Sequence, residues 1–321
     1  MADSHAGAEM DAGTEALLDR IGGRFPPSNA LSPAGARAAL RATFPDPGGE
    51  TPGVAATRDL LLDGPGGDLP VRAYDPTADD PPVLVYFHGG GWVRGDVDTH
   101  DELCRDLCRR TRALVCSVDY RRAPEHPFPA AFADCYAATA WAADHAGSLG
   151  ADPSRLAVAG DSAGGNLAAA VALRARDADG PAVSHQGLLY PVVRRELDTD
   201  SYRAHADDGL LTRAAMDWYW ERYLPADLHA HNPYAVPARA PTLADLPPAT
   251  VVTAGFDPLR DEGTAYAERL REAGVDVETR DYPTTVHAFL SFPDLDVAAE
   301  GRAAFAADVR DALDVAEPPA E

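Results

Sequence analysis

The chain has 321 residues, enough for one large α/β domain or two smaller domains. Hydrophobic residues make up 45% of it and charged residues 25%, ordinary values that exclude an intrinsically disordered or fibrous protein. Its 51 Asp and Glu residues against 28 Lys and Arg residues leave a formal net charge of -23, which disfavours nucleic acid and anionic membrane surfaces as partners.

The first 50 residues combine helical patterns with turn-forming residues. Helices are expected at 14–21 and 33–43, with Pro26-Pro27 between them and a Pro- and Gly-rich stretch after them. Such a segment is too short to have a core of its own, so it should pack on the rest of the chain. Two extended runs follow, at 58–62 and 69–74. A turn-rich stretch joins them, which predicts an antiparallel hairpin.

From residue 83 onward, short apolar runs alternate with helical patterns. Strands are expected at 83–87, 113–118, 156–159, 186–190, 249–254 and 275–282. Helices are expected at 99–112, 132–145, 166–176, 262–273 and 298–315. Strands without polar alternation, separated by helices, predict an α/β fold with a mostly parallel sheet that is buried on both faces.

Residues 192–240 interrupt this alternation with a charged segment that contains a helical pattern at 213–223. An insertion after a strand lies near the sheet edge where open α/β sheets bind ligands. We therefore expect residues 1–50 and 192–240 to form a helical cap. Residues 51–191 and 241–321 would then form the α/β domain that contains the sheet.

The most informative motif is Gly160-Asp-Ser-Ala-Gly-Gly165, between a predicted strand and a predicted helix. In a G-x-S-x-G elbow the turn from strand to helix is so tight that the positions on either side of the serine have no room for side chains, which accounts for Gly160 and Gly164. The hydroxyl of Ser162 then projects into the cleft. The alternative is a glycine-rich turn with an incidental serine. The motifs described next favour Ser162 as a nucleophile.

A second motif, His88-Gly-Gly-Gly-Trp92, directly follows the strand at 83–87. Consecutive glycines allow backbone N–H groups to point at one position, as an oxyanion hole requires. We predict that the N–H groups of Gly90, Gly91 and Ala163 form this hole. A phosphate-binding loop is disfavoured because no G-x-G-x-x-G spacing opens a helix here.

A nucleophilic serine needs a base and an acid that orients the base, in the chain order Ser, Asp or Glu, His. Asp257 and His287 each follow a predicted strand at the same sheet edge as Ser162, so we expect them to complete a triad. Asp261 and Glu262 are alternative acids one helical turn further along. Four other histidines lie on predicted loops or in the insertion and are poorer candidates: His185, His205, His229 and His231. No metal or cofactor is expected.

Taken together, these motifs resemble the hormone-sensitive-lipase-like group of α/β-hydrolases, which includes bacterial and archaeal carboxylesterases. The resemblance covers residues 55–315 and rests on His88–Gly91, Asp119–Pro129, Gly160–Gly165, Asp257–Leu259 and His287–Phe289. It implies the α/β-hydrolase fold, the triad and oxyanion hole named above, and a helical cap. It also implies supporting roles for His88, Arg121 and Glu125.

The resemblance further implies hydrolysis of short- to medium-chain carboxylic esters through an acyl-enzyme. Amide or peptide hydrolysis by the same triad stays open. So does a non-catalytic small-molecule receptor, although such receptors lack the histidine that is present here as His287. Four aromatic residues are candidates for lining the substrate pocket: Trp92, Trp218, Tyr219 and Phe289. Members of the group often dimerise through the last strand, so a homodimer is also open.

The sequence departs from the group's pattern at three places. Arg122 stands where a leucine is usual, Thr284-Thr285 replaces a glycine before His287, and Ala288 replaces a glycine after it. The last two substitutions are expected to affect the position of the histidine loop, and with it the rate and the substrate range.

Composition also suggests the setting in which the protein works. The chain has no lysine and one isoleucine, Ile21, which either a GC-rich genome or adaptation to molar salt would explain. Arginine has not risen to balance the acids, so we favour a salt-adapted, cytoplasmic protein. The N-terminus lacks the pattern of a signal peptide, and no apolar run reaches the length of a membrane span. The four cysteines form no C-x-x-C pair and are expected to be buried thiols.

Overall fold

The computed structural model describes residues 8–21, 27–44, 52–207 and 209–315. Their strands form one sheet with the order β1-β2-β4-β3-β5-β6-β7-β8. The strands are β1 (Ala56–Gly64), β2 (Gly67–Asp75), β3 (Pro82–Phe87), β4 (Leu114–Val118), β5 (Asp152–Asp161), β6 (His185–Leu189), β7 (Ala249–Phe256) and β8 (Val277–Val286). Strand β2 pairs antiparallel with β1 and β4, and all other pairs are parallel. The predicted hairpin and mostly parallel sheet are confirmed.

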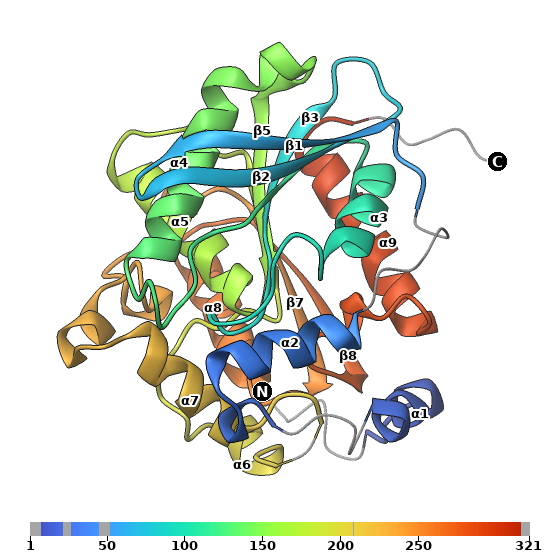
Figure 1. Cartoon of the computed structure of the whole chain (residues 1–321), viewed down its shortest axis with the longest axis vertical. Helices are drawn as coiled ribbons and strands as arrows, with labels where there is room; N and C mark the ends of the chain where they lie inside the picture. The colour runs from blue at the N-terminus through green and yellow to red at the C-terminus, as the bar shows by residue number, and fades with distance from the viewer. Residues whose placement is uncertain (1–7, 22–26, 45–51, 208, 316–321) are drawn as a thin grey trace.

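Helices cover both faces of the sheet (Figure 1). One face is covered by α3 (Asp101–Thr111) and α9 (Asp296–Ala312), and the other by α4 (Ala130–His145), α5 (Ala163–Asp177) and α8 (Arg260–Glu272). Successive residues of a strand point to opposite faces, so each central strand contributes to two hydrophobic clusters. Val85 and Phe87 of β3 pack in the cluster with α4 and α5, whereas Tyr86 packs in the cluster with α3.

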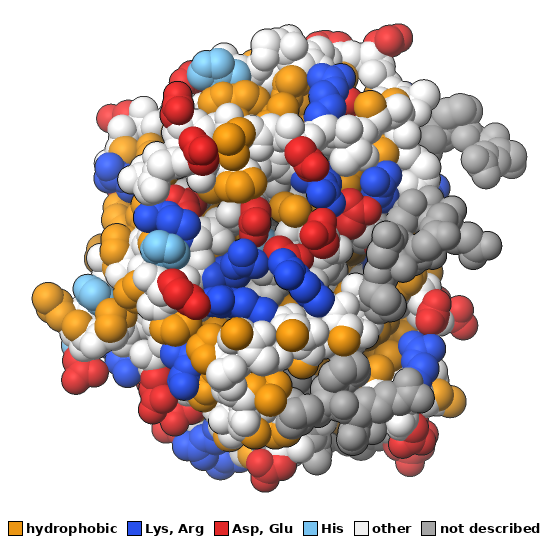
Figure 2. All heavy atoms as spheres, viewed as in Figure 1, with side chains coloured by type: hydrophobic (Ala, Val, Ile, Leu, Met, Phe, Trp, Pro, Cys, Tyr) orange, Lys and Arg blue, Asp and Glu red, His pale blue; other side chains and the backbone are white. Residues whose placement is uncertain are grey.

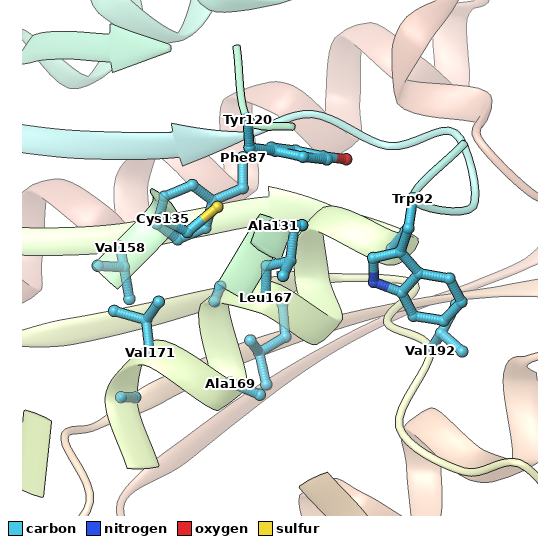
Figure 3. Close-up of a cluster of buried hydrophobic side chains, with 14 of the residues drawn as sticks. Phe87, Trp92, Tyr120, Ala131, Cys135, Val158, Leu167, Ala169, Val171 and Val192 are labelled. Carbon is cyan, nitrogen blue, oxygen red and sulfur yellow. The ribbon is translucent and has the colours of Figure 1, made fainter. Parts of the chain in front are cut away.

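Figure 3 shows part of the larger cluster, where Phe87 and Val158 from the sheet meet Leu167 and Val171 of α5. All four side chains are fully buried. Burying a side chain of this size stabilises a fold by about 1.5–3 kcal/mol, so this layer holds α5 firmly against the strands. The predicted thiols also lie in the core: Cys104, Cys108, Cys116 and Cys135 are buried and free.

Several element boundaries differ from the sequence-based expectation, most of them by one to three residues. Helix α5 begins at Ala163, three residues early, because Gly164 and Gly165 are helical rather than part of a loop. Strand β5 begins at Asp152, four residues early. Strand β8 continues to Val286 through Pro283, which an edge strand tolerates because its outer N–H groups need no partner.

The N-terminal helices and the insertion lie beside one another at one end of the molecule, at the bottom of Figure 1. The N-terminal segment contains α1 (Ala12–Ile21), the 3-10 turn η1 (Ser28–Ala30) and α2 (Pro33–Thr43). The insertion contains α6 (Asp200–Ala204), α7 (Arg213–Tyr223), η3 (Asp227–His231) and η4 (Pro237–Arg239). A further turn, η5 (Phe289–Ser291), follows β8, and η2 (Ala146–Leu149) follows α4. Within the described ranges, no helix combines the length and the apolar character that a bilayer crossing requires.

Ion pairs attach α2 to the sheet domain. Arg37 donates to Glu125 at 2.6 Å, and Arg41 pairs with Asp96 at 2.7 Å. Figure 2 shows basic and acidic side chains intermingled over this face of the molecule. Glu125 therefore fixes the N-terminal segment, while Arg121 pairs with Asp134 of α4 at 2.8 Å.

Candidate active site

Ser162 lies at the turn between β5 and α5, with φ of 57° and ψ of -117°. A positive φ is unusual for serine, and the surrounding structure must hold it. A Cβ at Gly164 would lie 1.8 Å from the carbonyl oxygen of Phe87, and a Cβ at Gly160 would lie 2.5 Å from the same oxygen and from the backbone of Gly164. The two glycines therefore let β5 and α5 approach closely, and the serine hydroxyl lies at the N-terminus of α5, where the helix dipole favours negative charge.

His287 and Asp257 meet Ser162 from two neighbouring strands. The Nε2 atom of His287 lies 3.0 Å from Oγ of Ser162, and its Nδ1 lies 2.7 Å from Oδ2 of Asp257. The other oxygen of Asp257 accepts the N–H of Leu259 at 2.9 Å, and the carboxylate is fully buried. The three side chains thus form a continuous hydrogen-bond chain, with the carboxylate held in one orientation.

The glycine loop after β3 faces the same point. Gly90 has φ of 118° and Gly91 has φ of 63°, conformations that glycine adopts without strain. Gly91 packs directly against the ring of Tyr219 from α7, with no space for a side chain between them. In the described part of the chain, the N–H groups of Gly90, Gly91 and Ala163 donate to no protein acceptor. They are therefore available to a ligand.

A buried polar cluster under this loop was not expected from the sequence. The Asp161 carboxylate accepts the N–H of Gly89 at 2.9 Å and the hydroxyl of Tyr86 at 2.8 Å, and it lies 3.4 Å from Nε2 of His100. Burial alone would raise the pKa of Asp161, but His100 and Tyr86 lower it below its usual value. The sequence signal for this cluster was Asp161, the acid directly before the nucleophile. Asp161 is too close to Ser162 along the chain to orient His287, so it must have another role.

His88 supports the loop from below. Its ring is fully buried and stacks on Tyr120 with 4.2 Å between ring centres, and its Nδ1 lies 2.8 Å from the carbonyl of Gly89. Burial lowers the pKa of His88 to about 3, so the ring is neutral at ordinary pH. A neutral, enclosed ring of this kind is a packing element.

The alternative acids have other partners. Asp261 accepts the N–H of Ser201 at 2.7 Å, and the buried Glu262 accepts the N–H of Val193 at 2.7 Å. His185 is buried in β6 rather than on a loop, which corrects the expectation. Its Nε2 lies 3.1 Å from the hydroxyl of Thr250.

A cavity of about 520 Å³ opens beside Ser162 and His287. One wall is the glycine loop, and the others come from the N-terminal segment, the insertion and the segment that follows β8. The N-terminal segment contributes Leu18, Leu40 and Phe44, and α7 contributes Met216 and Tyr219. Both segments that were expected to form the cap therefore line this cavity.

Of the four aromatic residues expected to line the pocket, the structure places Tyr219 in the cavity wall. The other three do not contact the cavity, which corrects the prediction. Trp92 is fully buried and stacks on Tyr223 with 4.2 Å between ring centres, close to Val192 (Figure 3). Large apolar rings next to a site often pack in the core, and sequence alone does not show which way they point.

Trp218 lies under the guanidinium of Arg222, at 3.9 Å from the ring centre. Phe289 is fully buried and packs against Tyr190 and Tyr282. Both rings therefore pack against neighbouring side chains outside the cavity.

The departures from the family pattern have local explanations. Arg122 donates to the carbonyl of Gly95 and lies 3.4 Å from Asp119. The hydroxyl of Thr285 lies 3.0 Å from that of Thr14, which joins the histidine loop to α1. Ala288 has φ of 62°, the conformation in which a glycine is usual. The chain thus keeps the backbone path while changing side chains.

A serine on a strand-to-helix elbow, with a histidine and a buried carboxylate from later strands of one sheet, defines the α/β-hydrolase class. Comparison with known proteins agrees. Residues 84–291 match the family model described as alpha/beta hydrolase fold, and the chain belongs to this family.

Several relatives with names are esterases. The chain is 48% identical over 240 residues to "Esterase LipI" of Mycobacterium tuberculosis, covering 73% of this chain and 75% of that protein. It is 40% identical over 242 residues to "Arylesterase" of Saccharolobus solfataricus, covering 75% and 79% of the two chains. Among solved structures, an ester-hydrolase from the metagenome of Lake Arreo is 41% identical. It has a TM-score of 0.89 and matches 94% of this chain and 98% of its own.

Proposed function

We propose that this protein is a carboxylesterase in which Ser162 is the nucleophile, His287 the general base and Asp257 the residue that orients it. The observation that carries the proposal is the hydrogen-bond chain from Ser162 through His287 to Asp257, at 3.0 and 2.7 Å. The names of its relatives, which include carboxylic ester hydrolases, support the same activity.

In this mechanism His287 accepts the hydroxyl proton as Oγ of Ser162 attacks the ester carbonyl. The N–H groups of Gly90, Gly91 and Ala163 bind the oxyanion. His287 then gives the proton to the leaving alcohol, and the C–O bond of the ester breaks. A water molecule, deprotonated by His287, attacks the acyl-enzyme, and the acid is released as Ser162 recovers its proton.

The substrates we propose are esters of short- to medium-chain acids. A cavity of about 520 Å³ is large enough for a small ester with both of its arms, and much of its wall is apolar. We also propose that residues 1–50 and 192–240 act as a cap over the catalytic domain formed by residues 51–191 and 241–321. Their shared lining of the cavity supports this division.

Three further expectations stay proposals. The chain has 51 acidic and 28 basic residues, and this excess of acidic residues supports a salt-adapted, cytoplasmic protein. The position of β8 at the edge of the sheet supports a homodimer in which two such strands pair. Sedimentation in dilute and concentrated salt would test the dimer directly.

The activity is tested with p-nitrophenyl esters from short to long acyl chains, using the wild-type protein and Ser162→Ala in high salt. We expect turnover with an optimum at short or medium chains, and a loss of about 1,000-fold or more in the variant. Turnover that persists in Ser162→Ala would reject the assigned nucleophile. A folded wild-type protein that hydrolyses p-nitroanilides but no esters would instead establish an amidase.

A further inference from the structure

Among the described residues that line the cavity, Arg94 is the one arginine, and the chain has no lysine. A guanidinium nitrogen of Arg94 donates to Oγ of Ser28 at 2.8 Å, and the central carbon of the guanidinium lies 5.3 Å from the ring centre of Tyr219. Because Ser28 and Tyr219 both line the cavity, the charged group lies between two of its walls.

Arg94 has no acidic partner in the part of the chain that the structure describes. Its Nε is buried and makes no hydrogen bond, and Ser28 accepts the one side-chain hydrogen bond that Arg94 donates there. Other arginines nearby are paired, as Arg37 is with Glu125 and Arg41 with Asp96. In a chain with 51 acidic residues, a cation in a cavity wall that has no counter-ion among the described residues is a charge that a ligand can pair with.

The backbone holds Arg94 at a fixed place relative to the glycine loop. Its own N–H donates to the carbonyl of Gly90 at 2.9 Å. The ring of Tyr219, over which the guanidinium lies, packs on Gly91. The guanidinium therefore keeps its position relative to the N–H groups that we assign to the oxyanion. Its planar fork of donors matches a carboxylate.

We infer that the site accepts esters that carry a carboxylate on one of their two arms, and that Arg94 is the residue that binds this carboxylate. The inference rests on the proposed function, because it assigns a substrate class to the same cavity. Two of the described lining residues are acidic, and neither forms an ion pair with Arg94: Asp161 is bound by Gly89 and Tyr86, and the side chain of Asp207 is exposed. The net charge of -23 repels anions at long range, but salt screens that repulsion beyond about 10 Å at 0.1 M.

The test compares esters that differ only in charge. For the acyl arm, the mono-p-nitrophenyl ester of adipic acid is compared with p-nitrophenyl 6-methylheptanoate, in which an isopropyl group replaces the carboxylate. For the alcohol arm, para-acetoxybenzoate is compared with para-isopropylphenyl acetate. The ratio of kcat/KM for the anionic and neutral member of each pair is measured for the wild type, Arg94→Gln and Arg94→Lys. Ser28→Ala is the matched control, since it removes the contact with Ser28 and keeps the charge.

We expect Arg94→Gln to lower the ratio at least about 10-fold in one pair, through the anionic substrate. Arg94→Lys should keep part of the preference, and Ser28→Ala should keep the ratio even if it slows both substrates. If Arg94→Gln leaves the ratio unchanged in both pairs, or slows both members equally, Arg94 only anchors the N-terminal segment and the inference is wrong.

The proposed function is judged separately, from hydrolysis of the neutral esters by the wild type and its loss in Ser162→Ala. If neither member of a pair is turned over, calorimetric titration of wild type and Arg94→Gln with para-acetoxybenzoate still decides the inference. Binding that needs Arg94 would support it, and equal binding or none would overturn it.

Discussion

The carboxylate of Asp257 approaches His287 with one oxygen, at 2.7 Å, while its other oxygen accepts the N–H of Leu259 at 2.9 Å. The backbone of the loop after β7 thus fixes the plane of the acid, and the acid in turn fixes the imidazole ring. The orientation of His287 therefore depends on the backbone at the carboxyl end of β7.

The role of Asp257 predicts a specific loss. Asp257→Asn keeps the shape but allows the amide to donate, which favours the wrong imidazole tautomer, so kcat for a p-nitrophenyl ester should fall about 10,000-fold. The matched control is Asp261→Asn, four residues further along in the first turn of α8, where the amide oxygen can still accept the N–H of Ser201. The control should stay within about 10-fold of the wild type. Equal losses in both variants would point to Asp261 or to a general disturbance of the loop.

The two glycines after Ser162 should differ in what they tolerate. A Cβ at Gly164 would lie 1.8 Å from the carbonyl oxygen of Phe87, whereas a Cβ at Gly165 would lie 3.0 to 3.2 Å from Pro191 and the carbonyl oxygen of Gly160, contacts that a shift of a few tenths of an ångström relieves. We expect Gly164→Ala to cost about 3 kcal/mol or more of unfolding free energy, and Gly165→Ala about 1 kcal/mol or less. Urea unfolding of the two variants measures this. Equal stabilities would mean that the elbow is not held by this close approach.

Acid should destabilise the protein through His185. Burial lowers the pKa of His185 to about 4, below the unfolded value of about 6.5, so between these values the unfolded state binds more protons and stability falls as the pH falls. His185→Gln can keep a hydrogen bond to Thr250 and has no proton to take up. From pH 7 to pH 5 the wild type should lose about 2 kcal/mol more than the variant, at about 1.4 kcal/mol per pH unit.

Chemical unfolding at the two pH values tests this. His88, whose pKa is lowered in the same direction, titrates in both proteins and cancels in the comparison. For His100 burial opposes the proton, but Asp161 raises its pKa overall, so its contribution is lost as the pH rises instead. A parallel pH dependence of the two proteins would show that His185 is not responsible.

Salt should stabilise the protein. Screening weakens the mutual repulsion of the 51 acidic residues, so the melting temperature should rise on the order of 5 °C between dilute buffer and about 2 M KCl. An unchanged melting temperature would favour codon composition as the source of the acidic residues. Repeating the experiment at about pH 3, where most exposed carboxylates are protonated, is the control, because the effect should shrink there.

Local sequence was enough for the sheet, the helices that cover it and the three residues that meet at its edge. The apolar runs that form the strands and the G-x-S-x-G motif are signals carried by neighbouring residues. Asp257 and His287 each directly follow a predicted strand, which was enough to place both at the same edge of the sheet as Ser162. The start of α5 was misplaced because glycine is a poor helix former, while at Gly164 the need for close packing against Phe87 outweighs that preference.

The walls of the cavity were harder to anticipate. Trp92 and Tyr219 are both aromatic and both near the motifs, yet Trp92 stacks on Tyr223 in the core and Tyr219 faces the cavity. Their directions depend on contacts between α7 and the glycine loop, which lie more than 100 residues apart along the sequence. The cluster of Asp161 and His100 has the same origin, since its partners come from three separate segments.

The N-terminal segment, which Thr14 and Ser28 join to later parts of the chain, has a practical consequence for engineering because it supplies part of the cavity wall. The residues that we propose for the chemistry lie at the ends of buried strands, whereas Leu18, Leu40 and Phe44 line the cavity from the N-terminal segment outside the sheet. A library confined to those three positions would vary the shape offered to an acyl group while sparing the strand ends. Selectivity and foldability are therefore encoded by different stretches of the gene, and a laboratory selection can act on the first with little risk to the second.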